Sequence, residues 1–154
     1  MKSILAVLAM ALMPVALVAQ QLTLATRGQP ALYSIVKPAV ASPSQQYAAE
    51  ELQKFTEQMT GVKLPIVTDE APLPGQAILL GNTTEKLLGA PADLAALGED
   101  GFRLKTCASH LLVMGGPARG TLYGVYELLE RFGGCRWYTT WHSCLLYTSD
   151  AADE

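Results

Sequence analysis

The chain has 154 residues, of which 50% are hydrophobic and 16% are charged, and its formal net charge is −3. A composition this apolar excludes a disordered polar tail, and because there is no basic surplus, no nucleic-acid partner is expected. The chain has 3 cysteines, too few for a disulfide scaffold. The length is that of about one domain.

The first residues are typical of an export signal. Lys2 precedes an uncharged apolar run from Ile4 to Ala19, which is broken only by Pro14. The run is shorter than the roughly 20 residues that a membrane span needs, and its small final residue favours cleavage after Ala19. We predict a signal peptide over residues 1–19, a periplasmic or secreted location and no stable membrane span. An uncleaved N-terminal anchor is the alternative.

The last residues indicate a different origin from the rest. Residues 144–154 read CLLYTSDAADE, which resembles the translation of a transposase adapter used in shotgun sequencing. We therefore exclude this tail from the fold and expect the native gene to continue beyond Ser143. The domain proper then spans residues 20–143, and a chain of this size buries roughly two thirds of its unfolded surface. Of its cysteines, Cys107 and Cys135 either pair in an oxidising compartment or act as small buried hydrophobic residues.

The first half of the domain predicts two strands, a helix and two more strands. Strand, turn and strand are expected over residues 22–38, around Gly28-Gln29-Pro30. A helix follows, with Ser42-Pro43 at its start and Gly61 at its end. Its apolar stripe consists of Ala48, Leu52, Phe55 and Met59, with Glu50, Glu51, Gln53, Lys54, Glu57 and Gln58 on the wet side. The two following strands are residues 62–68, at an edge because of Pro65, and residues 77–80, which read as buried.

The second half predicts two strands and a second helix. Residues 83–99 are expected to form short helical pieces, followed by strands over 101–107 and 111–114, the latter apolar on both faces and therefore central. The second helix is expected to bury a stripe consisting of Leu122, Val125, Leu129 and Phe132, and to end at Gly133-Gly134. Residues 135–138 then resume as extended chain. The predicted fold class is α/β (α+β): a mixed β-sheet with two helices packed on one face, the other face still needing cover.

The glycine-rich turn at residues 115–120 has two interpretations. Glycine backbone before a helix can cradle a phosphate, but the P-loop lysine and the dinucleotide glycine spacing are both missing. The favoured interpretation is a tight crossover that lets the helix lie close to the sheet. Gly124, inside that helix, then marks a close neighbour.

Few residues suggest catalysis or metal binding. His110 and His142 are the only histidines, and without a third ligand at suitable spacing no metal site is expected. Asp69-Glu70 and Glu99-Asp100 are adjacent acidic pairs, whereas glycosidase carboxylates face each other from different elements, so these pairs are interpreted as solvated turns. We predict no catalytic residue, no cofactor and no metal in this chain.

An aromatic segment closes the domain. It contains Arg136, Trp137, Tyr138 and Trp141. Aromatic faces beside a guanidinium suit sugar rings and sugar carboxylates. The alternative is an aromatic plug that seals the domain onto its neighbour, and the two roles are compatible.

Three groups of residues carry a resemblance to a known family. They are Ala48–Leu52 with Thr60–Pro65, Ile78–Gly81 with Gly101-Phe102, and Arg119–Glu130 leading to Gly134–Trp137. Over residues 31–141 the sequence resembles the N-terminal α/β domain of α-glucuronidases of glycoside hydrolase family 67. It is also similar to the domain that precedes the barrel in β-N-acetylhexosaminidases.

The resemblance implies an accessory domain of an exported bacterial glycoside hydrolase that degrades polysaccharide. The catalytic carboxylates would lie on a following (β/α)₈ barrel of the same chain, which would be the domain's partner. Carried over residue by residue, the resemblance implies that Arg136 and Trp137 approach the carbohydrate substrate. Two alternatives stay open: a non-catalytic carbohydrate-binding or surface protein on the same scaffold, and a free-standing domain that ends near Ser143.

Overall fold

A five-stranded mixed sheet forms the centre of the protein. The computed structural model describes residues 23–89, 93–137 and, for the backbone, 145–146. The strand order is β2-β1-β3-β5-β4. Neighbouring strands are parallel among β1 (Ser34–Lys37), β2 (Ile66–Thr68), β3 (Ala77–Leu80) and β5 (His110–Gly115). β4 (Phe102–Cys107) pairs antiparallel to β5 at one edge, and β6 (Cys135–Arg136) pairs separately with β7 (Leu145–Leu146).

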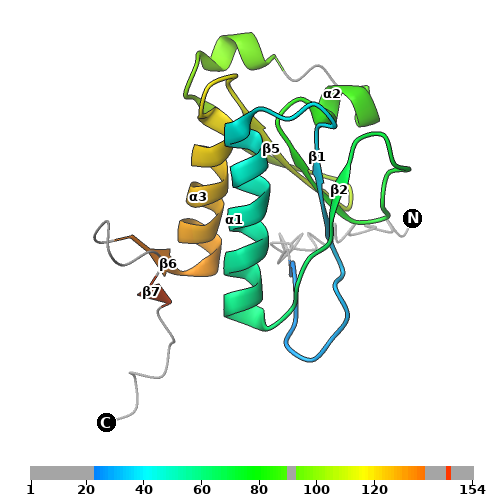
Figure 1. The fold of residues 1–154 in the computed structure, drawn as a ribbon, viewed down its shortest axis with the longest axis vertical. Helices are drawn as coiled ribbons and strands as arrows, with labels where there is room; N and C mark the ends of the chain where they lie inside the picture. The colour runs from blue at the N-terminus through cyan, green and yellow to red at the C-terminus, as the bar shows by residue number, and fades with distance from the viewer. Residues whose placement is uncertain (1–22, 90–92, 138–144, 147–154) are drawn as a thin grey trace, which may run out of the picture.

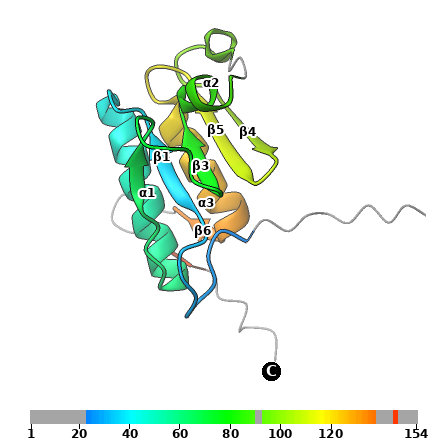
Figure 2. The same cartoon turned by 90° about the vertical axis from the view of Figure 1, so that its right-hand side faces the viewer.

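Two long helices cover one face of this sheet. α1 (Pro43–Thr60) and α3 (Gly120–Gly133) lie side by side there (Figures 1 and 2). The short helix α2 (Thr83–Leu88) and the 3₁₀ helix η1 (Leu94–Leu97) lie in the connection from β3 to β4, where short helical pieces were predicted. The predicted fold class is confirmed. None of the described helices is long and apolar enough to cross a membrane.

The sheet separates two apolar clusters, because successive residues of a strand point to opposite faces. The larger cluster lies between the sheet and the helix pair, and its fully buried members include Ile35, Leu52, Phe55, Ile78, Leu80, Val113 and Val125. The smaller cluster lies on the opposite face, where strand residues pack against side chains of α2, η1 and the loop after β2. Its members are Val36, Ala77, Leu79, Leu112 and Met114, with Leu73, Leu87, Leu88, Leu94 and Leu97 packed against them. This corrects the expectation that the face away from the helices lacks cover.

Local signals fix the ends of α1. The Ser42 side chain accepts a hydrogen bond from the Gln45 N–H, and the Gln45 side chain accepts one from the Ser42 N–H, a complete capping box. Gly61 ends the helix with a φ of 73°, in the left-handed region that glycine adopts without strain. Both ends were predicted, because both depend on residues close in the sequence.

Several expected details are wrong. Within the described part of residues 22–38 the first expected strand is not formed and β1 begins only at Ser34, although Leu24 and Ala25 still pack against the larger cluster. Phe132 is 70% exposed rather than buried, while Leu128, which was not predicted, takes a buried position. The strand predicted over residues 62–68 is confined to the residues after Pro65, at the sheet edge where that proline placed it.

The cysteine alternatives are settled by the position of Cys107. This residue is a free, exposed thiol, so the pair with Cys135 does not form. Cys135 is fully buried, and its Sγ lies 3.9 Å from the Sδ of Met59. Cys135 is disulfide-bonded, so the interpretation of both cysteines as small buried hydrophobic residues is wrong.

Candidate functional site

The glycine-rich turn between β5 and α3 is a packing device. A Cβ on Gly116 would lie 2.0 Å from the carbonyl oxygen of Gly98, and one on Gly120 would lie 2.2 Å from that of Gly101. The Gly116 N–H donates to the Gly101 carbonyl at 2.8 Å, and the Ala118 N–H donates to the Glu99 carbonyl at 3.2 Å. The turn's N–H groups are therefore engaged within the protein, which supports the crossover interpretation over a phosphate cradle.

Gly124 also has the close neighbours that the sequence predicted. A Cβ there would lie 2.8 Å from Cγ1 of Val113 and 3.3 Å from Cβ of Phe102. The missing side chain thus lets α3 approach β5 and β4. Together the turn and Gly124 fix the height of α3 above the sheet.

The acidic pair before this turn is anchored by one arginine. The Arg119 guanidinium contacts both carboxylate oxygens of Asp100, at 3.0 and 3.2 Å. It also lies 5.6 Å from the ring of Tyr123, over which it stacks. Hydrogen bonding to Asp100 raises the pKa of Arg119. The ion pair of Arg119 and Asp100 is exposed, so it orients these side chains on the surface but adds little to the stability of the fold.

Asp69 is buried at its turn, which corrects the expectation of a solvated residue for Asp69, whereas Glu70 is exposed as expected. Its side chain is only 7% exposed. Its Oδ1 accepts a hydrogen bond from the Ala39 N–H at 3.0 Å and lies 3.0 Å from Nζ of Lys86. Burial alone would raise the pKa of Asp69, but the hydrogen bonds from Lys86 and Ala39 outweigh it and lower that pKa. The carboxylate thus ties the end of β2 to the loop before α1 and to α2.

The two predicted substrate-binding residues lie at the end of α3. The ring of Trp137 packs edge-on against Phe55 and Tyr126, with centroids 5.9 and 5.1 Å apart. Arg136 Nη1 lies 3.3 Å from a carboxylate oxygen of Glu130 and 3.2 Å from the Glu130 carbonyl. Trp137 is half-buried within its own domain, as a plug would be. Contact of Arg136 and Trp137 with a sugar stays a prediction, and Tyr138, Trp141 and His142 lie outside the described residues.

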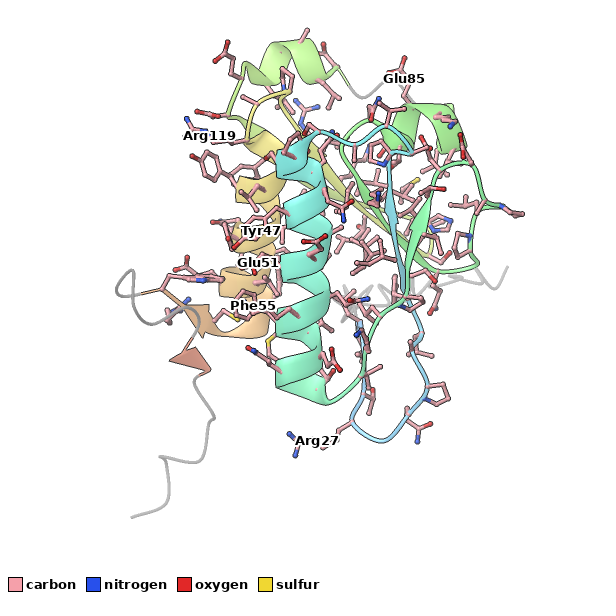
Figure 3. The ribbon with its side chains drawn as sticks, viewed as in Figure 1. Arg27, Tyr47, Glu51, Phe55, Glu85 and Arg119 are labelled. Atoms are coloured by element: carbon pink, nitrogen blue, oxygen red, sulfur yellow. The ribbon has the colours of Figure 1, made fainter. Side chains whose placement is uncertain are left out.

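A polar cluster beside Trp137 was not predicted. The Glu51 side chain is 7% exposed although its helical position reads as solvent-facing. It accepts a hydrogen bond from the Tyr126 hydroxyl at 3.3 Å and pairs with Lys54 Nζ at 3.1 Å (Figure 3). Burial, followed by the negative charge of Glu51, raises the pKa of Tyr126. The sequence around Glu51 gives no sign of such burial, because the side chain that contacts its carboxylate comes from the other helix.

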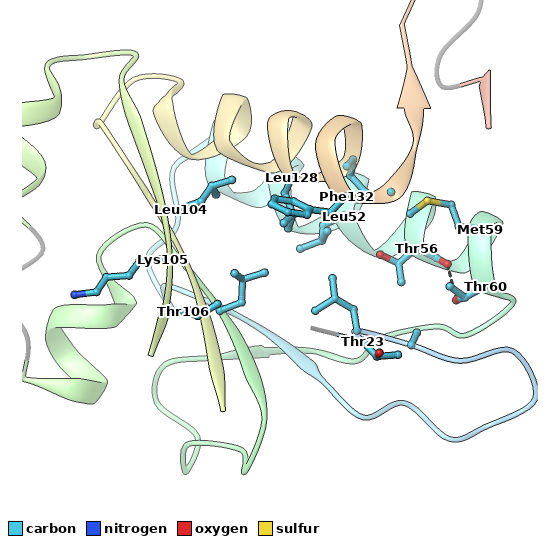
Figure 4. A pocket seen from close by; sticks show the side chains of 15 residues that line it. Thr23, Leu52, Thr56, Met59, Thr60, Leu104, Lys105, Thr106, Leu128 and Phe132 are labelled. Carbon is cyan, nitrogen blue, oxygen red and sulfur yellow. Dashed lines mark hydrogen bonds between the residues drawn. The ribbon is translucent and has the colours of Figure 1, made fainter. Parts of the chain in front are cut away.

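An open hollow of about 890 Å³ lies between the helix pair and the sheet (Figure 4). Its apolar lining includes Leu24, Leu52, Met59, Leu104, Leu111, Leu128, Leu129 and Phe132. Threonine hydroxyls complete it, and Thr56 Oγ1 is buried there without a hydrogen-bond partner. Such a lining suits an apolar segment better than a polar sugar.

The other residues considered for metal binding or catalysis form no site in the described part of the chain. In the described ranges, no group of three or more His, Cys, Asp or Glu residues could hold a metal ion. His110 begins β5, and its Nδ1 is buried without a hydrogen-bond partner. Glu51, Asp69 and Asp100 are engaged with Lys54, Lys86 and Arg119 respectively.

The mixed sheet, the helix pair and the tight glycine crossover define an α/β domain with its two long helices on one face of the sheet. Comparison with known proteins makes this specific. The family described as Glycosyl hydrolase family 67 N-terminus matches residues 19–128, and the chain belongs to that family. The resemblance inferred from the sequence is thereby confirmed.

A solved structure shows the same fold within a longer enzyme. A family GH115 4-O-methyl-α-glucuronidase with specificity for decorated arabinogalactans matches with a TM-score of 0.54 and 22% identity, over 68% of this chain. This chain spans 14% of the length of that enzyme. A GH138 enzyme targeting pectin rhamnogalacturonan II matches with a TM-score of 0.47 and 19% identity, over 70% of this chain and 11% of that one. No curated protein matches the chain.

Proposed function

We propose that this chain is the accessory N-terminal domain of an exported bacterial glycoside hydrolase that acts on polysaccharide, of the α-glucuronidase or β-N-acetylhexosaminidase kind. The family match over residues 19–128 carries the proposal. Hydrolysis would use two carboxylates around an oxocarbenium-like transition state, both supplied by a catalytic domain of the same polypeptide. This domain would support that neighbour and would itself be inactive.

The engagement of the acidic side chains supports an inactive domain. A general acid or nucleophile needs a carboxylate that faces the substrate. Asp69 is held by Lys86 and the Ala39 N–H, and Glu51 is held by Lys54 and Tyr126. These carboxylates are parts of the scaffold.

The test begins with the uninterrupted gene, obtained from a read that crosses codon 143. The full-length protein and residues 20–143 are then assayed with aryl glucuronides and aryl N-acetylglucosaminides. We expect turnover by the full-length protein and none by the shorter piece. Turnover by residues 20–143 alone would overturn the assignment.

Export is proposed from the leader over residues 1–19 and has its own measurement. The full-length protein is expressed in a bacterial host and its mature N-terminus is sequenced from the periplasmic and extracellular fractions. We expect the sequence to begin at Gln20. Retention of Met1 on a membrane-bound product would favour the uncleaved anchor instead.

The second candidate is a non-catalytic carbohydrate-binding protein on the same scaffold. The half-buried Trp137 beside Arg136 favours it, since an aromatic ring with a guanidinium suits a sugar. The downstream sequence discriminates between the two. Acidic residues at the ends of barrel strands favour the enzyme, whereas a sandwich or a stalk favours the binding protein.

A further inference from the structure

We propose that the catalytic domain of the same polypeptide docks on the outer face of the helix pair, the surface that α1 and α3 turn away from the sheet. This inference rests on the proposed function and adds the surface through which the accessory domain acts. We call this surface the helix face and define it by Tyr47, Tyr123, Tyr126 and Arg119, with Trp137 packed against Tyr126.

The composition of the helix face is that of an interface. Tyr47 on α1 is 48% exposed and Tyr123 on α3 is 37% exposed, and the Arg119 guanidinium stacks on Tyr123 (Figure 3). Tyrosine, tryptophan and arginine are the residue types enriched where proteins dock. A surface that stayed in water would carry mainly charged side chains at these helical positions.

Three ion pairs near the helix face are formed within the domain. Lys54 pairs with Glu51, and Arg136 pairs with Glu130. Glu127 and Arg131, one helical turn apart on α3, form a third pair. These six charges are compensated before a neighbour covers them, which lowers the desolvation cost that an unpaired charge would add.

The polar groups beneath the helix face are held in place before any partner arrives. The buried Glu51 carboxylate fixes the Tyr126 hydroxyl at 3.3 Å, and Trp137 packs across Phe55 and Tyr126. Side chains that are ordered in advance lose less freedom on docking.

The direction of the chain points to the same side. β6 and Trp137 follow α3 directly, and Trp137 lies on α1 and α3 residues rather than on the strands. A domain that follows in the sequence is thus tethered beside the helix face, which raises its effective concentration there. The opposite face of the sheet is occupied by α2, η1 and the loop after β2.

The proposal is tested by hydroxyl-radical footprinting of the full-length protein, with the urea-unfolded protein as the reference for each tyrosine. Tyr33, which is 4% exposed in the domain core, defines the protection of a buried tyrosine. We expect Tyr47 and Tyr123 to be protected as strongly as Tyr33. Phe132, which is 70% exposed at the hollow rather than on the helix face, should stay reactive.

A variant pair in the full-length protein gives a second readout. Tyr47→Arg should separate the thermal unfolding of the N-terminal domain from that of the catalytic domain, because a charge would lie in the interface. Leu32→Arg changes a residue of similar exposure, 50%, outside the helices and should leave a single transition. Equal behaviour of the two variants would contradict docking on the helix face.

The outcomes separate the two proposals. If the native gene encodes no further domain, the proposed function fails and the inference fails with it. If it encodes a catalytic domain but Tyr47 and Tyr123 react as exposed tyrosines, the docking surface is wrong while the proposed function stands.

Discussion

Replacement of Asp69 tests how the β2 edge of the sheet is joined to α2. The carboxylate accepts the Ala39 N–H and pairs with Lys86 from a position that is 7% exposed. In Asp69→Ala, the Ala39 N–H loses its acceptor, and a hydrogen bond to a charged group contributes about 1.5–3 kcal/mol. The Lys86 side chain is 53% exposed, so its ion pair adds only about 0–1 kcal/mol. We expect Asp69→Ala to lower the free energy of unfolding by roughly 2–3 kcal/mol.

Two milder replacements separate the contribution of the Ala39 hydrogen bond from that of the Lys86 ion pair. Asp69→Asn keeps an oxygen for the Ala39 N–H but removes the charge, so it should cost about 1 kcal/mol. Lys86→Met removes only the exposed partner and should cost about 0–1 kcal/mol. The expected order of destabilisation is Asp69→Ala, then Asp69→Asn, then Lys86→Met.

The contribution of Asp69 should depend on pH. Because the pKa of Asp69 is lowered in the folded protein, its contribution is complete above the ordinary value of 3.8 and is lost as the pH falls through the lowered value. Urea unfolding followed by far-UV circular dichroism at pH 7 and near pH 3 measures both effects. The difference between the wild type and Asp69→Ala should be largest at pH 7. If the two proteins have equal stability at pH 7, the buried carboxylate does not join these elements.

Three further predictions follow from the packing and the titrating groups. Gly124→Ala should destabilise by about 0–2 kcal/mol in urea unfolding, because overpacking against Val113 outweighs the gain of about 1 kcal/mol in helix propensity; Gly75→Ala, with nothing within 4 Å of its Cβ, is the neutral control. The raised pKa of Tyr126 predicts that stability falls as the pH rises above the ordinary value of 10.0, and Tyr126→Phe should remove part of that fall when unfolding is measured from pH 8 to 11. Cys107 is free and exposed, so it should react with a chromogenic disulfide reagent in the native protein; a thiol that reacts only in denaturant would contradict its exposure.

The sequence predicts most accurately what local residues decide. The capping box of Ser42 and Gln45, and the left-handed Gly61, need no distant partner. The strand at residues 77–80 is equally clear, because four consecutive apolar residues between turn signals fit a strand that is buried on both faces. The glycine crossover was recognised because a phosphate loop requires side chains that are missing here.

The errors arise where a distant segment decides burial. Glu51 reads as solvent-facing on α1, but the Tyr126 hydroxyl from α3 donates a hydrogen bond to its carboxylate. Asp69 reads as a turn residue, yet its partners stand 30 residues before it, at Ala39, and on α2. Phe132 continues the apolar period of α3 but lies at the rim of the open hollow, where the sheet no longer covers the helix.

The closing Arg136-Trp137 segment shows how the plug and the sugar contact can coexist. Trp137 rests one side of its ring on Phe55 and Tyr126, and it is still partly exposed. Arg136 is oriented by Glu130, which lies on the exposed surface, so a sugar carboxylate would compete with Glu130 for the same guanidinium. Docking of a catalytic domain on the helix face would remove water from around Arg136. The attraction between its guanidinium and a carboxylate, of Glu130 or of the sugar, would then be stronger. Packing of Trp137 against the helices would thus favour contact of Arg136 with a ligand. Because Glu130→Gln removes the competing carboxylate, this variant of the full-length protein should have a lower KM for an acidic substrate and an unchanged KM for a neutral one.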